Sequence, residues 1–143
     1  MSQTKQRVVA FPYFYKNNVL HIVLITNKKG NHWILPKGHT ERAFKKSSVA
    51  LIESFEEAGV RGFLGSEEIT YTITNKKKAI TYICYPIIID TLLSEWEESS
   101  LRKRVVLPLD KALKKVSSKT NKAIITYFGN ALTSPSSFKS NLL

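Results

Sequence analysis

Three glutamates, Glu53, Glu56 and Glu57, lie within about one helical turn of each other in the stretch "ESFEEAG". Residues three and four apart are neighbours on a helix, and like charges at that spacing destabilise it. The acids also stand near the C-terminal end of the expected helix, where the helix dipole disfavours negative charge. A divalent cation removes both penalties, because Mg²⁺ and Mn²⁺ prefer oxygen ligands. The spacing therefore indicates a metal site able to polarise a phosphoryl group, with a solvated acidic patch as the alternative.

The acids need a helix to present them, and the sequence predicts one over residues 44–58. Gly59 follows it as a residue that tolerates the left-handed backbone at a helix end. At roughly 100° per residue, this helix has an apolar side opposite the glutamates. The apolar side consists of Phe44, Leu51, Phe55 and Ala58. We expect that side to pack against a sheet and the glutamates to face a cleft or solvent.

The other elements predict a mixed sheet flanked by helices. Stretches rich in β-branched and aromatic residues alternate with turn residues. The expected strands are 7–15, 19–26, 33–36, 60–65, 69–74, 79–90 and 101–108, with turns at 16–18 and 75–78. Two further helices are expected at 108–116, where Pro108 and Asp110 suit a first turn, and at 121–132. This order favours a layered α/β or α+β domain.

The residues around the acids resemble the signature of the Nudix (MutT-related) hydrolases. That signature is Gly, five residues, Glu, seven residues, then Arg-Glu-apolar-x-Glu-Glu-x-Gly-apolar. Gly38 matches its first glycine, the three glutamates match the acids of its second block, and Gly59-Val60 match its end. The approach "WILPKGH" is similar to members that act on dinucleoside polyphosphates or diphosphoinositol polyphosphates. The order of "TYICYPIIIDTLLSEWEESS", "RKR" and "LDKALKKV" resembles the latter group, so the resemblance covers roughly residues 7–130.

The resemblance implies an α/β/α sandwich with a mixed central sheet. We expect a single Nudix domain over residues 7–133, with the signature at 38–60. Residues 1–6 are expected to be a flexible N-terminus and residues 134–143 a disordered tail.

The resemblance also implies hydrolysis of a nucleoside diphosphate linked to another group, or of a similar phosphoanhydride. The reaction would require Mg²⁺, which Mn²⁺ can replace. In that scheme Glu53, Glu56 and Glu57 are the catalytic metal ligands, and Gly38 closes the loop above them. One of these glutamates, or an acid outside the signature, helps deprotonate the attacking water.

Two positions depart from the signature. Phe44 stands where the family has Glu, and Ile52 stands where it has Arg, two residues that commonly form a salt bridge there. Replacing both partners of an ion pair by apolar residues can be neutral or stabilising if the volume fits, whereas losing one strands a charge. We therefore predict that Phe44 and Ile52 contact each other. A brace from Glu41 to Arg42 or to a lysine is the alternative.

A third departure lies outside the signature. Diphosphoinositol relatives carry a Glu after "RKR" that can serve near the metals, and this chain has Val105. Glu95, Glu97 or Glu98 in "SEWEESS" would substitute for it, with an exposed acidic loop as the alternative.

Cations near the metal site would bind the phosphates of a substrate. The candidates are Arg7, Lys28, Lys29, Lys37, His39 and Arg104, the last within the cluster "RKR". The relatives also carry an Arg before "TY", where this chain has Ile80, which weakens recognition of a fully phosphorylated inositol ring. Trp33, Tyr82 and Trp96 are interpreted as core or loop anchors, with base stacking as the alternative.

The composition favours anionic partners. The chain of 143 residues has 22 Lys and Arg against 11 Asp and Glu, a formal net charge of +11. Such a charge suits phosphorylated small molecules, nucleic acid or a membrane surface, although scattered lysines also occur as a solvated face. No run is long and apolar enough to span a bilayer, and "MSQTKQR" has no apolar signal region. We therefore expect a cytoplasmic protein without a membrane partner.

The single cysteine, Cys84, excludes an internal disulfide and a cysteine zinc cluster. It lies in an apolar run, so we expect a small buried core residue.

The preferred hypothesis is a metal-dependent pyrophosphohydrolase acting on a diphosphoinositol polyphosphate or a dinucleoside polyphosphate. A catalytically weak or inactive Nudix-fold sensor of a phosphorylated ligand is the second hypothesis. A module that binds RNA ends through the lysines ranks last, because the chain lacks a helix-turn-helix, zinc-finger or RNP-type pattern. The protein could be a monomer or a homodimer.

Overall fold

The computed structural model of the chain describes residues 4–66, 68–74 and 79–132. Its strands are β1 (Thr4–Lys16), β2 (Val19–Thr26), β3 (Trp33–Ile34), β4 (Lys37–His39), β5 (Val60–Leu64), β6 (Ile69–Thr74), β7 (Ala79–Leu92) and β8 (Arg104–Pro108). Its helices are α1 (Lys46–Ala58), α2 (Leu109–Lys115) and α3 (Lys119–Leu132). The predicted turn at 75–78 and the predicted tail at 134–143 lie outside the described residues.

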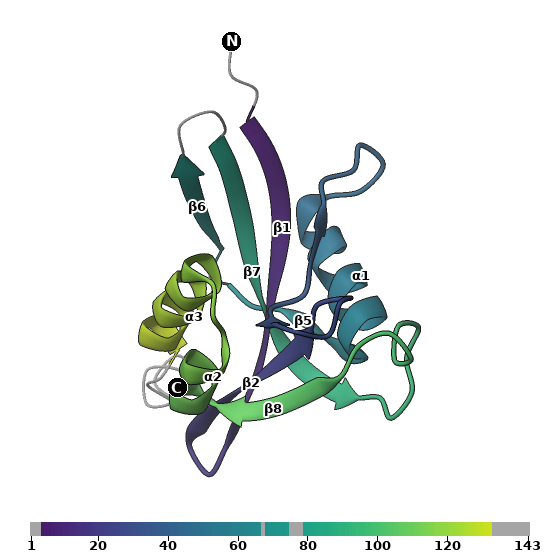
Figure 1. Cartoon of the computed structure of the whole chain (residues 1–143), viewed down its shortest axis with the longest axis vertical. Helices are drawn as coiled ribbons and strands as arrows, with labels where there is room; N and C mark the ends of the chain where they lie inside the picture. Colours follow the sequence, from purple (N-terminus) through teal and green to yellow (C-terminus); the bar gives the residue numbers. More distant parts are fainter. Residues whose placement is uncertain (1–3, 67, 75–78, 133–143) are drawn as a thin grey trace.

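The strands form one mixed sheet, as predicted. The order β3-β2-β1-β7-β5 runs across the sheet, while β4 pairs with β1, β6 with β7 and β8 with β2. The long central strands β1 and β7 are parallel, from Thr4↔Ala79 to Tyr13↔Ile88, and the other pairings are antiparallel. Figure 1 shows β1 and β7 side by side through the middle of the molecule.

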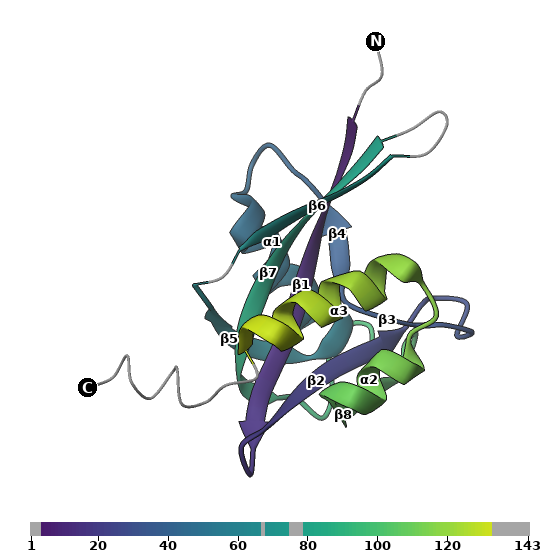
Figure 2. The same cartoon turned by 90° about the vertical axis from the view of Figure 1, so that its left-hand side faces the viewer.

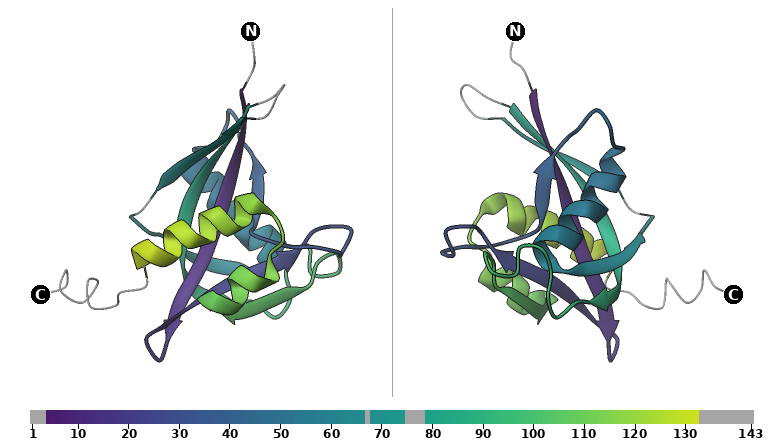
Figure 3. Two further views of the ribbon diagram at one scale, coloured as in Figure 1. Left: turned by 60° about the vertical axis from the view of Figure 1, so that its left-hand side comes forward. Right: turned by 90° about the vertical axis from the view of Figure 1, so that its right-hand side faces the viewer.

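Helices cover both faces of this sheet, which gives the expected α/β/α sandwich. Helix α1 lies on one face, and α2 and α3 lie on the other (Figures 1 and 3). Figure 2 shows α3 crossing over β1. Because strand side chains alternate between faces, Val9 and Phe11 enter the core under α2 and α3, whereas Val8 and Ala10 enter the core under α1.

The face of α1 that meets the sheet differs from the prediction. Phe44 lies before the helix, which begins at Lys46, and its side chain is 48% exposed. Phe55 is 39% exposed, whereas Glu57, expected on the open side, is 5% exposed. The buried stripe is Val49, Ala50, Ser54, Glu57 and Ala58. Its small residues let the helix lie close to the sheet. The side of the helix that faces the sheet is therefore the one with small residues, rather than the one with the largest apolar residues.

Strand β4 was not predicted, and it positions the start of the site. The chain after β3 was expected to continue as a loop, but Gly38 pairs with Val8 of β1. The backbone N–H of Ala10 also donates to Pro36 O at 2.9 Å. These bonds hold the segment before α1 against the centre of the sheet.

Other element boundaries shift by a few residues. β1 begins at Thr4, inside the segment expected to be flexible, and α3 begins at Lys119. Gly59 has φ 65°, so the prediction of a left-handed residue at the end of α1 is confirmed. None of the described helices is long and apolar enough to cross a membrane.

The thiol of Cys84 should be unreactive in the folded protein. The residue is fully buried, as predicted, and burial raises the pKa of its thiol to about 12. Because the thiolate is the reactive species, an aromatic disulfide reagent at mildly alkaline pH should label the protein only after unfolding in guanidinium. Rapid labelling of the native protein would contradict the packing of β7 described here.

Candidate functional site

The C-terminal end of α1 is capped by the chain between β7 and β8 and by the first residue of β8. The last four carbonyls of a helix have no partner within it, and here three of them accept hydrogen bonds from distant residues. The bonds are Glu98 N to Glu56 O at 3.1 Å, Trp96 Nε1 to Glu57 O at 2.8 Å and Arg104 Nη1 to Ala58 O at 2.9 Å. This cap brings the acids of the β7–β8 loop beside the acids of α1.

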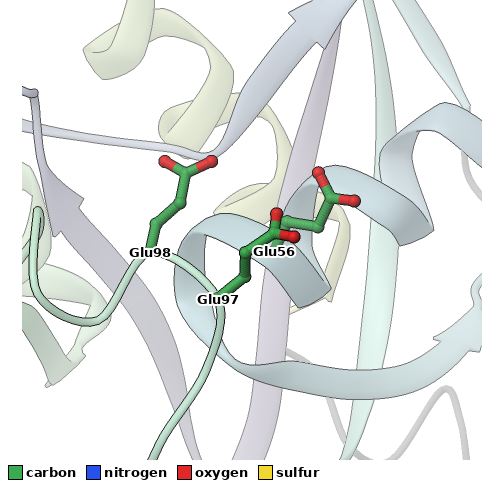
Figure 4. Close-up of side chains that lie close together, drawn as sticks. All are labelled: Glu56, Glu97 and Glu98. Atoms are coloured by element: carbon green, nitrogen blue, oxygen red, sulfur yellow. The ribbon is translucent and has the colours of Figure 1, made fainter.

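Glu56, Glu97 and Glu98 form a compact group of carboxylates. Each offers an oxygen, and these oxygens all lie within 4.8 Å of one another. Figure 4 shows Glu56 on α1 and the other two on the loop. The structure thus brings two of the three loop acids considered from the sequence to the acidic cluster, whereas Glu95 is exposed and outside this group.

Glu57 is the buried member of the trio. Burial raises the pKa of its carboxyl to about 8; the charge of Arg102 acts against this rise, and the adjacent carboxyl of Glu53 adds to it. The two carboxyl groups are hydrogen-bonded to each other. Such a hydrogen bond requires a proton on one of the two carboxyl groups. The backbone N–H of Lys37 also donates to Glu57 Oε1 at 3.3 Å.

The pKa values of Glu53 and Glu56 are raised as well. Burial raises the pKa of both carboxyls; nearby Glu98 and Glu41 raise that of Glu53 further, and Glu97 raises that of Glu56. Charges this crowded favour protons or a cation in their midst.

Gly38 lies directly against Glu53. A Cβ added at Gly38 would stand 2.5 Å from Glu53 Oε2, so a larger residue would displace the carboxylate. The predicted neighbourhood of Gly38 and the acids is therefore present. Its part in holding a metal remains a prediction.

The donor set fits a hard divalent cation. The five glutamates of this region, Glu53, Glu56, Glu57, Glu97 and Glu98, supply carboxylate oxygens from α1 and the β7–β8 loop. Mg²⁺ and Mn²⁺ prefer such ligands. Soft thiolate ligands are absent from the group, so it does not suit a metal that needs them.

Two arginines of "RKR" serve the fold of the site. Arg102 Nε donates to Glu98 Oε1 at 2.8 Å, and its Nη2 lies 3.9 Å from Glu57 Oε1. Arg104 caps Ala58 O, and its guanidinium lies 4.3 Å from the Trp96 ring centroid. Arg104 was predicted to bind substrate, but the structure gives its guanidinium these internal contacts. Trp96 is confirmed as an anchor.

The other predicted substrate cations lie on β1, β4 and the β2–β3 loop. Arg7 is opposite His39 in the β1–β4 pairing. Lys28 and Lys29 are exposed in the loop between β2 and β3. Lys37 lines a pocket of about 400 Å³ beneath the start of α3.

A second pocket, of about 540 Å³, opens beside the acids. His39, Glu41, Glu53 and Glu56 line it together with Phe44 and Ile52. The two apolar departures from the signature therefore flank the same opening. Direct contact between their side chains remains a prediction.

Known proteins similar to this chain in sequence and in fold are Nudix proteins. No family profile matches the chain. Among curated proteins, Nudix hydrolase 21, chloroplastic, of Arabidopsis thaliana is 34% identical over 117 residues, covering 76% of this chain and 58% of that protein. Diphosphoinositol polyphosphate phosphohydrolase 3-beta of Bos taurus is 30% identical over 95 residues, covering 65% of this chain and 57% of that protein.

Solved structures agree on the fold. The NUDIX domain of Shewanella oneidensis NrtR, complexed with ADP ribose, has a TM-score of 0.76 at 16% identity, covering 92% of this chain and 90% of that one. The Ap4A hydrolase of C. elegans has a TM-score of 0.71 at 17% identity, covering 91% of this chain and 99% of that one. The chain is similar to Nudix hydrolases in sequence and has the Nudix fold, as its sequence predicted. It spans less than two thirds of the length of the curated relatives it matches.

The metal-free protein should lose stability as the pH rises from about 5 to about 8. With its pKa raised to about 8, Glu57 binds a proton in the folded state that the unfolded chain has already released, so the free energy of unfolding falls across this window. Denaturant titrations in a chelator would measure this fall. Its largest part should be lost in Glu57→Gln, leaving the smaller contribution of Glu53 and Glu56, and all of it should persist in Glu95→Gln, which alters an exposed acid. A fall of equal size in Glu57→Gln would refute the assignment.

Phe44 and Ile52 should be energetically coupled. In a double-mutant cycle with Phe44→Ala and Ile52→Ala, side chains in contact should give a coupling of about 0.5 kcal/mol or more. Denaturant unfolding of the two single variants and the double variant measures this. Phe63→Ala, an exposed residue of β5 outside this pocket, paired with Ile52→Ala provides the additive reference. Additivity in the Phe44–Ile52 cycle would show that the predicted contact is absent.

Proposed function

We propose that the protein is a divalent-metal-dependent hydrolase of a phosphoanhydride bond in a nucleoside diphosphate derivative or a similar compound. Its substrate would be a dinucleoside polyphosphate or a diphosphoinositol polyphosphate. The observation that carries the proposal is the convergence of acids from α1 and the β7–β8 loop at one end of the helix, next to Gly38. The names of the relatives, which include phosphohydrolases of diphosphoinositol polyphosphates and an Ap4A hydrolase, support the same reaction class.

Each part of the site has a role in this reaction. Glu53, Glu56 and Glu57 hold Mg²⁺ or Mn²⁺. The bound ion supplies charge neutralisation at the phosphoryl oxygens and activates water. Glu97 and Glu98 add negative charge beside the trio, and Arg102 keeps Glu98 and Glu57 oriented.

Cations on the sheet complete the phosphate site. Lys37 and His39 are exposed on β4, on either side of Gly38. Their side chains would bind the phosphate chain of the substrate while the acids hold the metal. The net charge of +11 agrees with an anionic small-molecule ligand.

A sensor that binds without hydrolysis is the second candidate. Phe44 and Ile52 replace the two charged residues of the signature, and both line the pocket beside the acids. A solved neighbour, the NUDIX domain of NrtR, was obtained as a complex with ADP ribose. Such a protein would bind a phosphorylated ligand and leave its phosphoanhydride intact.

Hydrolysis assays separate the two candidates. The full chain would be incubated with dinucleoside polyphosphates, diphosphoinositol polyphosphates, nucleotide sugars, oxidised nucleotides and capped RNA ends, each with Mg²⁺ or Mn²⁺. We expect turnover of at least one substrate that a chelator abolishes. Glu57→Gln should lower it by orders of magnitude because it removes a buried ligand, whereas Glu95→Gln should leave it unchanged. Binding without product at every metal level would instead establish the sensor.

A further inference from the structure

Apolar side chains gather at the surface around β5. Half of the large apolar residues that are exposed in the described chain lie here, namely Phe55 of α1, Phe63 and Leu64 of β5, and Ile88 of β7. Phe63 stands opposite Ile88 in the β5–β7 pairing, and Phe63 and Phe55 line one groove of about 380 Å³. Exposed apolar residues that cluster in this way mark an interaction surface, whereas single ones do not. We name this the β5 groove; its apolar lining residues are Leu51, Phe55, Val60 and Phe63, and its charged ones are Arg61 and Asp90.

The groove lies at one end of the sheet. β5 is the last strand in the order β3-β2-β1-β7-β5, and Figure 1 shows it beside α1, on the side of the molecule away from α2 and α3. A bulge between Arg61 and Gly62 interrupts its pairing with β7. Gly62 also lines the groove without a side chain, and an added Cβ there would clash with Ile88 O. Because a bulge and a charged residue discourage the addition of another strand, a partner should bind here through side chains.

The two charged residues of the β5 groove have opposite signs and are both exposed. The guanidinium of Arg61 lies 5.8 Å from the Phe55 ring centroid, and Asp90 Oδ2 accepts from Thr91 Oγ1 at 2.9 Å. Within the part of the chain that the structure describes, neither Arg61 nor Asp90 takes part in a salt bridge. A partner that complements the groove therefore presents an apolar side chain, one anion and one cation.

A second copy of this chain presents that same set of side chains. In a two-fold symmetric dimer every contact occurs twice, once in each direction. Arg61 of each chain would then meet Asp90 of the other, and Phe63, which is 64% exposed, would pack into the opposite groove. The net charge of +11 makes two copies repel each other over most of their surfaces, whereas the charges that line the β5 groove cancel.

We infer that the β5 groove is the interface of a two-fold symmetric dimer of this chain. Phe63 of each chain packs into the groove of the other, and two reciprocal Arg61–Asp90 ion pairs flank the two rings. The groove shares no lining residue with the pocket beside the acids. The dimer therefore leaves both carboxylate clusters open, and the inference does not depend on the proposed function.

Sedimentation velocity of the full chain over a range of protein concentrations tests the dimer. At a salt concentration of about 0.15 M the Debye length is about 8 Å, so the repulsion between the net charges is largely screened. We expect an equilibrium between monomer and dimer. Phe63→Ala should weaken association at least tenfold, because each dimer loses two buried rings. Tyr127→Ala removes an exposed ring on α3 outside the groove and should leave association unchanged.

Charge reversal tests the reciprocal ion pairs. Arg61→Asp places two anions opposite each other at each contact, and Asp90→Arg places two cations there, so each variant alone should associate at least tenfold more weakly than the unaltered chain. An equimolar mixture of the two variants should form a heterodimer, because both of its contacts then join opposite charges. The double variant should dimerise with itself again. Arg61→Asp also lowers the net charge, so an effect of overall repulsion alone would strengthen association instead.

Thermal melting checks that each variant is folded. The altered side chains are exposed, so the melting temperatures of dilute, monomeric samples should stay close to that of the unaltered chain. Heterodimer formation is a second check, since unfolded chains would not regain a defined mass on mixing.

Three results would overturn the inference. A chain that stays monomeric at every concentration up to its solubility limit would leave the groove to a different partner. A dimer whose affinity neither Phe63→Ala nor Arg61→Asp changes would form through another surface. A mixture of the two charge-reversal variants that stays monomeric would exclude the reciprocal Arg61–Asp90 pairs.

Discussion

Glu57 is only 5% exposed and lies among other glutamates. Since water can hardly reach its carboxyl group, that group must be stabilised by contacts within the protein. The backbone N–H of Lys37 donates to it, and the guanidinium of Arg102 lies 3.9 Å from its Oε1. The carboxyl of Glu53 also interacts with it. These partners come from β4, the β7–β8 loop and α1. Without them the burial of this acid would oppose folding, so the position of each segment is tied to this one side chain.

The same arrangement explains why α1 lies where it does. Small residues, Ala50 and Ala58, bring the helix close to the sheet, and Gly38 leaves room for Glu53 on the strand side. A larger residue at Gly38 would displace the Glu53 carboxylate. The close packing of the helix and the convergence of the carboxylates are therefore two aspects of one structure.

The sequence predicted most of the fold and the centre of the site. Strand patterns predicted the mixed sheet, and the spacing of Glu53, Glu56 and Glu57 indicated a site that Gly38 and the loop acids adjoin. The predicted face of α1 was right for Ala58 and for Leu51, which packs against the core, but wrong for Phe55, because closeness of packing favoured small residues. Periodicity alone does not distinguish these two faces.

Contacts between distant residues could not be predicted. Trp96 and Glu57 are 39 residues apart, and Arg104 and Ala58 are 46 apart. No local pattern links such pairs, since the contacts exist only once β5 and β7 have paired and brought the loop to the helix end. The strand β4 was not predicted because its three residues are too few to show the alternation that indicates a strand.

The loop that caps α1 has a consequence for how the molecule can vary. Two hydrogen bonds bind it to carbonyls at the end of the helix, and Arg104 at the start of β8 makes a third, so the loop cannot swing away without leaving carbonyls unpaired. The acids on both segments thus behave as one preorganised body, and a ligand meets little ordering entropy at this end.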